Sequence, residues 1–192
     1  MDIMLVFETS GVGSIPAWPA KIMYFLKAKT NEITVHHQNP NPEKTSWGMV
    51  DAIPYLKQLG LEKFSNTVAA LSVWMKPYDK LEIHKDRRFD DSGIKWSLLL
   101  SPIGHKEVTV ELFNEIQPST SSCVSMAGNS VIHFLPEENA NLIASWDMKD
   151  GPCIFDAYSE WHRAINRTGN PINIVSLRSV DSELNLILPH IL

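Results

Sequence analysis

Residues 66–86, NTVAALSVWMKPYDKLEIHKD, mark the point at which the chain changes to short β-strands. The run at 68–74 is rich in β-branched and aromatic residues, which favour strands, and a turn separates it from a second run at 81–84. His84 and Asp86 close the stretch, one residue apart. The segment therefore predicts two strands, with a His-x-Asp pair where the second strand ends.

The rest of the chain continues this pattern of short apolar runs separated by Gly, Pro, Asn and Asp clusters. Many short strands without intervening helices favour a sandwich or jelly roll over a parallel α/β sheet. We therefore predict an all-β core. The further predicted strands lie at 95–100, 108–113, 131–135, 139–146, 153–155, 163–166 and 172–177.

The first 65 residues are more mixed and predict peripheral α/β elements. Ile53, Leu56 and Leu59 fall at helical spacing, and Gly60 follows as a typical residue after a helix end. We expect one helix around 51–59, packed outside the core. The 192 residues are expected to form a single domain.

Composition excludes several classes of protein. A net charge of −5 and a pI near 5.8 argue against binding of nucleic acid or of an anionic membrane, which both favour a basic surface. No apolar run approaches the roughly 18–20 residues of a membrane span, and the N-terminus lacks the pattern of a signal peptide. Cys123 and Cys153 form no disulfide framework, so we expect a cytoplasmic protein.

His84, Asp86 and the distant His162 together form the ligand set of a 2-His-1-carboxylate facial triad. The one-residue gap between His84 and Asp86 places both side chains on the same side of an extended strand. Such a triad holds one face of a non-haem Fe(II) and leaves the other positions open for oxygen and a co-substrate. A His-x-Asp triplet alone is weak evidence, and a surface His and Asp is the competing interpretation.

The surrounding residues resemble the Fe(II)/2-oxoglutarate-dependent oxygenases. Residues 75–102 are similar to the first half of that family's core, where a Pro-containing turn leads to an I-H-x-D strand and then to an apolar strand ending in Pro. Residues 151–178 resemble the second half: a strand, the distal His162, Asn166 four residues later, and a polar turn ending in Pro171 before a final strand. The pattern is most similar to aspartyl/asparaginyl β-hydroxylase-like proteins and small phage or bacterial oxygenases.

This resemblance implies a double-stranded β-helix, a jelly roll of cupin-like form, over residues 66–180, with residues 1–65 as an extension packed on it. It implies that His84, Asp86 and His162 bind Fe(II) and carry the catalysis. The co-substrates would be 2-oxoglutarate and O2, and decarboxylation would be coupled to hydroxylation of a C–H bond. The substrate would be a small molecule or a peptide side chain.

One position departs from the family. A basic residue commonly follows the distal His by ten residues and holds the far carboxylate of 2-oxoglutarate, but Ile172 stands there. Lys95 takes its place in the prediction, because some members use a basic residue from the strand after His-x-Asp, and Ser97 shares its strand face. Arg178 is a further candidate for binding 2-oxoglutarate, although six residues displace it by about 20 Å from Ile172.

Two other functions remain open. Ile172 favours a cupin-type metalloenzyme, a dioxygenase or isomerase that uses the triad without 2-oxoglutarate. A non-catalytic jelly-roll binding module is the third possibility, with an accidental His-x-Asp pair. Trp161 beside His162 is either a packing residue or a wall of the site.

Overall fold

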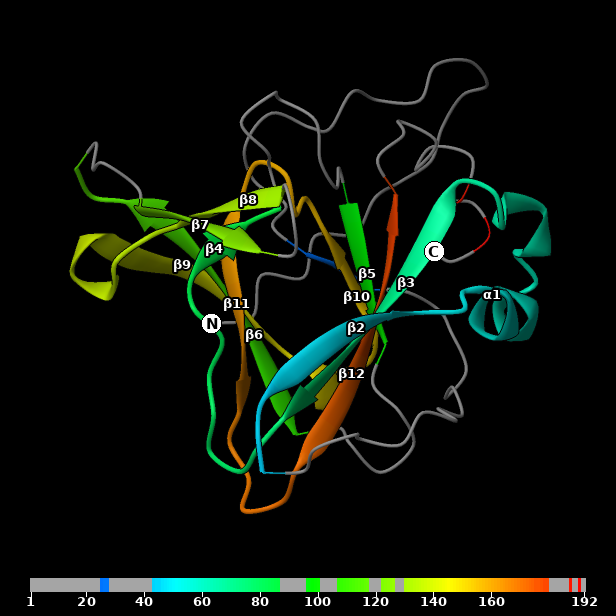
Figure 1. Ribbon diagram of the computed structural model, residues 1–192, viewed down its shortest axis with the longest axis horizontal. Helices are drawn as coiled ribbons and strands as arrows, with labels where there is room; N and C mark the ends of the chain where they lie inside the picture. Colours follow the sequence, from blue (N-terminus) through cyan, green and yellow to red (C-terminus); the bar gives the residue numbers. More distant parts are fainter. Residues whose placement is uncertain are drawn as a thin grey trace.

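Figure 1 shows the computed structural model of the protein, which describes residues 25–27, 43–86, 96–100, 107–117, 122–126, 130–179, 187 and 190. The strands are β1 (Leu26–Lys27), β2 (Ser46–Val50), β3 (Val68–Met75), β4 (His84–Lys85), β5 (Trp96–Leu100), β6 (Val108–Glu115), β7 (Ser122–Met126), β8 (Ser130–Phe134), β9 (Ala140–Asp147), β10 (Cys153–Phe155), β11 (Trp161–Asn166) and β12 (Ile172–Ser179). The helical elements are α1 (Ile53–Leu59) and the single 3-10 turns η1 (Glu62–Phe64), η2 (Glu137–Asn139) and η3 (Met148–Asp150).

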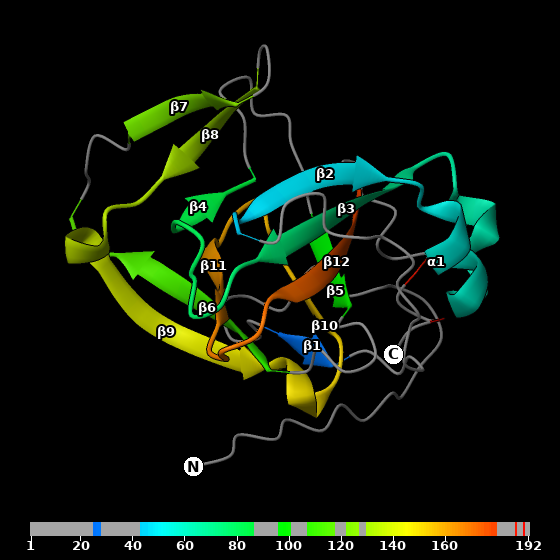
Figure 2. The same ribbon diagram turned by 60° about the horizontal axis from the view of Figure 1, so that its bottom comes forward.

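The strands form two six-stranded antiparallel sheets that face each other (Figure 2). The first sheet has the order β1-β10-β5-β12-β3-β2, and the second has the order β7-β8-β4-β11-β6-β9. Side chains from both sheets fill the space between them, among them Val73 and Ile174 from the first and Val110 and Leu112 from the second. This shared apolar interior holds the two sheets together.

The path of the chain through the sheets identifies the fold. Strands β3, β4, β5 and β6 alternate between the first and the second sheet, and β9, β10, β11 and β12 alternate in the reverse order. The chain therefore winds as a β-hairpin wrapped into a helix, with the β7–β8 hairpin inserted where the two halves meet. The fold is a double-stranded β-helix, or jelly roll, and the predicted fold class is confirmed.

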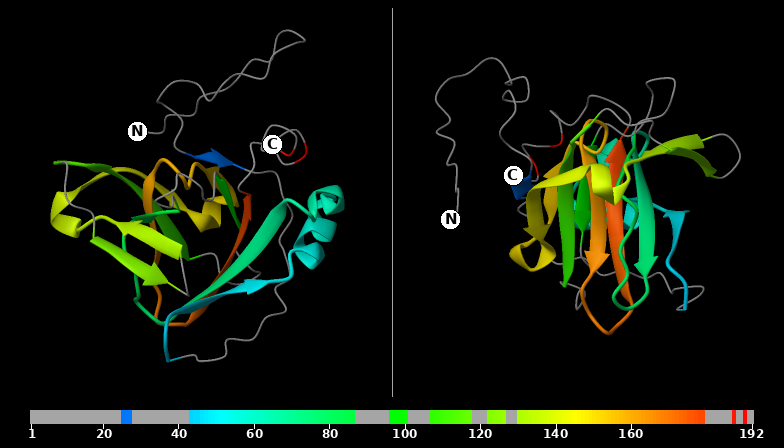
Figure 3. Two further views of the ribbon diagram at one scale, coloured as in Figure 1. Left: turned by 45° about the horizontal axis from the view of Figure 1, so that its top comes forward. Right: turned by 90° about the vertical axis from the view of Figure 1, so that its left-hand side faces the viewer.

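Helix α1 covers the outer face of the first sheet, at the opposite end of the molecule from the β7–β8 hairpin (Figure 3). Tyr55 and Leu56 are fully buried against strand residues such as Val175. Gly60 ends the helix with a φ of 69°, a left-handed conformation that suits glycine, and its N–H donates to the carbonyls of Leu56 and Lys57. The predicted helix around 51–59 and its position outside the core are therefore confirmed.

Most predicted strands are confirmed, but the sequence analysis missed β1 and β2 in the first sheet and β7 in the second, and the strand predicted at 81–84 is found at His84–Lys85. Strand β2 pairs with β3 along its whole length, from Ser46 opposite Trp74 to Val50 opposite Ala70. Gly48 lies at its centre, and because glycine is depleted in strands, this short run carries little local signal. Pairing with the long strand β3 supplies what the local sequence lacks. Within the described residues, no helix is long and apolar enough to cross a membrane.

Candidate metal centre

His84 and His162 face each other across neighbouring strands. His84 begins β4 and lies directly opposite His162 on β11 in the antiparallel register. Because opposed residues of a sheet project to the same face, the two imidazole rings meet, with their centroids 4.4 Å apart. Asp86 follows β4 immediately and is fixed by its backbone N–H, which donates to the carbonyl of Ala157 at 2.9 Å. Two strands and one backbone hydrogen bond thus bring the three predicted residues together.

The donor atoms of the three side chains are close enough to share one cation. One ligand atom from each of His84, Asp86 and His162 lies within 4.8 Å of the others. Nε2 of His84 lies 3.8 Å from Oδ1 of Asp86. Two imidazoles and one carboxylate are the donor set of non-haem Fe(II) sites, and the predicted convergence is present in the structure.

Both histidines are held in the same tautomer by the backbone. Nδ1 of His84 lies 2.8 Å from the carbonyl oxygen of Glu82, and Nδ1 of His162 lies 3.0 Å from that of Glu160. A carbonyl oxygen only accepts, so each Nδ1 must donate, and in the neutral form of each ring Nε2 keeps its lone pair. Metal-binding histidines are oriented in this way in known sites. Both rings are therefore prepared to bind a metal through Nε2.

Burial affects the two interior ligands differently. Desolvation, with a further contribution from His84, lowers the pKa of His162 from 6.5 to about 3, so its imidazole is neutral at physiological pH. Burial alone would raise the pKa of Asp86, but the Arg178 guanidinium and the two imidazoles outweigh it and hold the pKa below the usual value. Neutral imidazole and ionised carboxylate are the protonation states that bind a metal.

The lowered pKa of His162 predicts how the free energy of unfolding of the metal-free protein depends on pH. As the pH falls from about 7 to about 5.5, His162 gains a proton in the unfolded chain but not in the folded protein. We expect the free energy of unfolding to fall over this range in the presence of a chelator. Denaturant titrations at several pH values measure it, with the His162→Gln variant as the control. Parallel profiles for the two proteins would contradict the prediction.

Asp86 carries an unsatisfied buried oxygen. Its side chain is 5% exposed, and Oδ2 has no hydrogen-bond partner among the described residues. The closest positive group is Nη2 of Arg178, 3.5 Å away, which is an ion-pair contact rather than a hydrogen bond. A buried carboxylate oxygen without a hydrogen bond is costly. A divalent cation between the two imidazoles and Asp86, whose Oδ1 lies 3.8 Å from Nε2 of His84, would balance the charge of this buried carboxylate, so the residues present fit a metal ion.

A chain of polar side chains leads from the interior to Asp86. The hydroxyls of Ser97 on β5 and Ser176 on β12 lie 3.2 Å apart, and both side chains are buried. Ser176 in turn accepts a hydrogen bond from Nε of Arg178 at 3.0 Å. The guanidinium is therefore held by Ser176 while its Nη2 faces Asp86.

The structure places the predicted co-substrate residues at different points. Ser97 and Arg178 lie opposite each other on β5 and β12, next to the triad. Ile172 lies at the other end of β12, buried opposite Met75, in the apolar interior. Lys95 falls outside the described residues. Among the described residues, Arg178 lies beside the triad, because the end of β12, and not its start, reaches Asp86.

Two aromatic neighbours of the triad differ in role. Trp161 projects away from the interior and packs with Ile83, Phe113 and Leu135, so it is a packing residue and not a wall of the site. The sequence analysis missed Phe155, whose ring meets that of His162 edge-on at 4.8 Å. Phe155 lies in a short apolar strand with no motif around it, and its contact with His162 arises only because the two sheets face each other.

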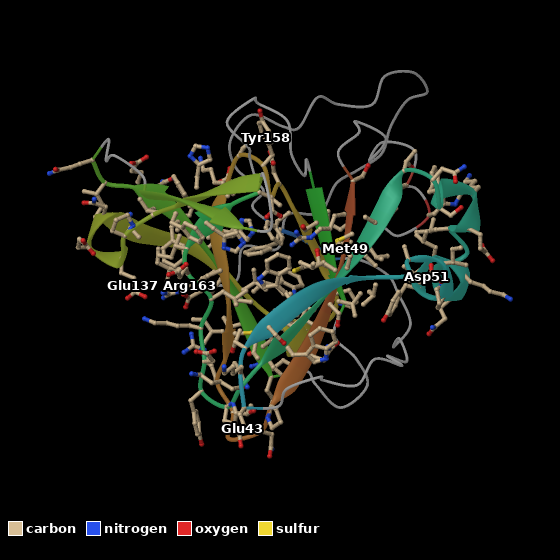
Figure 4. The ribbon with its side chains drawn as sticks, in the orientation of Figure 1. Glu43, Met49, Asp51, Glu137, Tyr158 and Arg163 are labelled. Atoms are coloured by element: carbon tan, nitrogen blue, oxygen red, sulfur yellow. The ribbon has the colours of Figure 1, made fainter. Side chains whose placement is uncertain are left out.

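The outer side of β11 carries a network of ion pairs next to His162. Arg163 donates to Glu111 at 2.8 Å and to Glu137 at 2.6 Å, and Figure 4 shows Arg163 and Glu137 side by side. Arg167 contacts the other oxygen of Glu111 at 3.1 Å, and Lys80 pairs with Glu137. This network joins β11, β6 and η2, and so stiffens the strand that carries His162.

Comparisons with known proteins add little beyond the fold. No family model matches the sequence, and no curated protein matches it. Solved structures that are similar include oxalate decarboxylase from Bacillus subtilis, at 12% identity and a TM-score of 0.37 over 76% of this chain and 28% of that chain. A cupin 2 domain-containing protein from Halorhodospira halophila is similar at 9% identity and a TM-score of 0.39, over 83% of this chain and 80% of that one. A recombinant oxalate oxidase in complex with glycolate is similar at 11% identity and a TM-score of 0.36, over 79% and 59%.

The chain spans 28% and 30% of the length of two similar oxalate decarboxylase chains. At TM-scores this low, the assignment of the fold rests on the strand order described above, and the argument for function rests on the site.

Proposed function

We propose that this protein is a metal-dependent enzyme of the cupin type, a dioxygenase or isomerase, with Fe(II) or a similar divalent metal held by His84, Asp86 and His162. The observation that carries the proposal is the buried Oδ2 of Asp86, which has no hydrogen-bond partner among the described residues. The other oxygen of the same carboxylate, Oδ1, lies 3.8 Å from Nε2 of His84, and backbone carbonyls orient both imidazoles through Nδ1. A surface His-x-Asp pair would have none of these features.

The residues around the triad have separate roles in the proposed function. A bound divalent metal supplies Lewis acidity and, as Fe(II), the capacity to activate oxygen. The backbone carbonyls of Glu82 and Glu160 orient the imidazoles, and Phe155 packs on His162 and excludes water from its interior side. We propose a small molecule or a peptide side chain as the substrate, with O2 as co-substrate for a dioxygenase, and the cytoplasm as its location.

A second candidate function is the Fe(II)/2-oxoglutarate-dependent hydroxylase that the sequence resembles. Arg178, held by Ser176 beside the triad, supports it, because it supplies a basic group that Ile172 does not. The distance between Arg178 and Asp86 supports the first candidate better. Arg178 lies so close to Asp86 that it would contact a group bound directly to the metal. The far carboxylate of 2-oxoglutarate is separated from its metal-binding keto acid end by two methylene groups, so it would lie further from the metal.

An anaerobic titration with Fe(II), followed by oxygen consumption, tests both functions. We expect one Fe(II) to bind per chain, and absence of binding would leave the non-catalytic module. Addition of 2-oxoglutarate to the Fe(II) protein then separates the two enzymes. Succinate formation that depends on 2-oxoglutarate identifies the hydroxylase, and its absence supports the cupin-type enzyme.

A further inference from the structure

We propose that strand β2 is the contact surface of a homodimer, in which the β2 strands of two copies pair antiparallel about a two-fold axis at Gly48. This pairing is independent of the proposed function, because it requires no metal and no substrate. Strand β2 is the last strand of the first sheet, next to β3, and no described strand pairs with its other edge (Figure 3).

The free edge of β2 lacks the features that normally keep sheet edges apart. An exposed edge presents unpaired N–H and C=O groups, and natural proteins commonly protect it with a proline or with charged side chains. The sequence of β2, SWGMV, contains neither. Its backbone groups can therefore pair with a strand from another chain.

The side chains of β2 make one face of this edge apolar. Trp47 and Met49 are 46% and 65% exposed. Trp47 lies opposite Val73 of β3, and both Val73 and Leu71, which lies opposite Met49, pack in the interior between the sheets. Because opposed residues share a face, Trp47 and Met49 also project to the inner face, where neighbouring side chains are buried. Ile53, just after β2, is 53% exposed and extends this apolar surface.

Antiparallel pairing about Gly48 is self-complementary. It places Trp47 of each copy opposite Met49 of the other on one face of a continuous sheet, and a methionine sulfur packs favourably against an aromatic ring. The backbone groups match as well. In an antiparallel strand, alternate residues direct both N–H and C=O to the same edge, and this pairing joins even positions to even and odd to odd. Each outward-facing residue therefore meets an outward-facing residue of the second copy.

Charges at the two ends of β2 favour the antiparallel arrangement. Lys44 and Asp51 are both exposed, and Figure 4 shows Glu43, the neighbour of Lys44, and Asp51 at opposite ends of the strand. Antiparallel pairing about Gly48 brings the end with Lys44 next to the end with Asp51 of the second copy, twice in each dimer. Parallel pairing would place each charge beside its own copy. Charge complementarity of this kind fixes orientation and register.

Sedimentation equilibrium of the full chain measures the association. We expect a reversible dimer at about 50 μM protein, since specific interfaces of ordinary size have micromolar or tighter affinity. Trp47→Glu and Met49→Lys should each weaken the dimer about 30-fold, a loss typical of a central interface side chain. The double variant should dimerise again, because each new acidic group meets a new basic group of the second copy. Leu142→Glu is the matched control, since Leu142 is 52% exposed on the edge strand β9 of the other sheet, and it should have no effect.

Cysteine cross-linking tests the position of the two-fold axis. The nearest described atom to a Cβ added at Gly48 belongs to the Trp74 ring, 4.0 Å away, so Gly48→Cys is accommodated. In the proposed dimer the two new thiols lie opposite each other, with Cα atoms about 5 Å apart, which suits a disulfide. Ser46→Cys is the control, because its two copies lie about 14 Å apart. Both variants are made with Cys123→Ser, and Cys153 is buried. Oxidised glutathione should yield a covalent dimer from Gly48→Cys alone.

Loss of the dimer in both single variants, its return in the double variant and cross-linking through position 48 support the proposal. A monomer at every concentration overturns it, as does a dimer that Trp47→Glu and Met49→Lys leave intact. Failure of the double variant to associate, or equal cross-linking through positions 46 and 48, overturns the two-fold axis at Gly48. Circular dichroism shows whether each variant is folded, and if one single variant is not, the other and the cross-linking decide.

Discussion

Replacement of His84 by alanine is expected to abolish stoichiometric binding of a divalent metal, and not merely to weaken it. The site has three protein ligands, and His84 is the one that faces both others, at 3.8 Å from Asp86 and with its ring 4.4 Å from that of His162. The variant leaves only the imidazole of His162 and the carboxylate of Asp86 as ligands. The carboxylate already forms an ion pair with Arg178. Metal content after gel filtration, together with calorimetric titration of Fe(II) under anaerobic conditions, measures the effect.

Two control variants show that the loss is specific. His190→Ala removes an exposed histidine that contacts Lys63 and is no part of the triad, so full metal binding is expected. Glu82→Ala should also bind metal normally, because the backbone carbonyl, and not the side chain, holds Nδ1 of His84. One Fe(II) per chain in the His84→Ala protein would show that the metal ligands were wrongly assigned.

Replacement of Arg163 by methionine is expected to lower the free energy of unfolding by about 3 kcal/mol, because it leaves a buried carboxylate with half of its partners. Glu111 is 6% exposed and accepts from Arg163 and Arg167, of which only the more exposed Arg167 would remain. Methionine keeps much of the packing on Phe113, which lies 5.0 Å from the guanidinium carbon, so the effect reports mainly on charge. Urea denaturation of the metal-free protein measures the change.

The control for Arg163 lies at the exposed end of the same network. Lys80 pairs with Glu137, and these two side chains are themselves 53% and 56% exposed. The Lys80→Met substitution should therefore lower the free energy of unfolding by no more than about 1 kcal/mol. Similar losses in the two variants would mean that the network is solvated throughout and that Glu111 needs no partner.

Local patterns in the sequence predicted the elements well where propensity and pairing agree. The branched and aromatic runs that became β3, β6, β11 and β12 were all predicted, because each has its own strong preference for extended structure. Gly60 marked the end of α1 for a conformational reason that needs no tertiary contact. Strand β2 could not be predicted in the same way, since Gly48 weakens its local preference and β3 supplies the pairing.

The sequence by itself predicted which three side chains converge at the candidate metal site. The spacing of His84 and Asp86 put both side chains on one face, and the type and order of the residues pointed to His162 as the third ligand. It also determined that Ile172 has no basic group to offer. These conclusions follow from residue chemistry and from the two-residue period of a strand, which are local properties.

Only the tertiary structure showed that Arg178 lies beside the triad. In the sequence, Arg178 lies six residues after Ile172, the position where a basic residue was expected. In the structure, the end of β12 that carries Arg178 lies beside Asp86, and the start that carries Ile172 lies in the apolar interior. The backbone carbonyls that orient both imidazoles, the ring of Phe155 and the buried oxygen of Asp86 also depend on sheets folded against each other. Contacts between residues far apart in the chain are set by pairing and burial, and neither is encoded in the spacing of a motif.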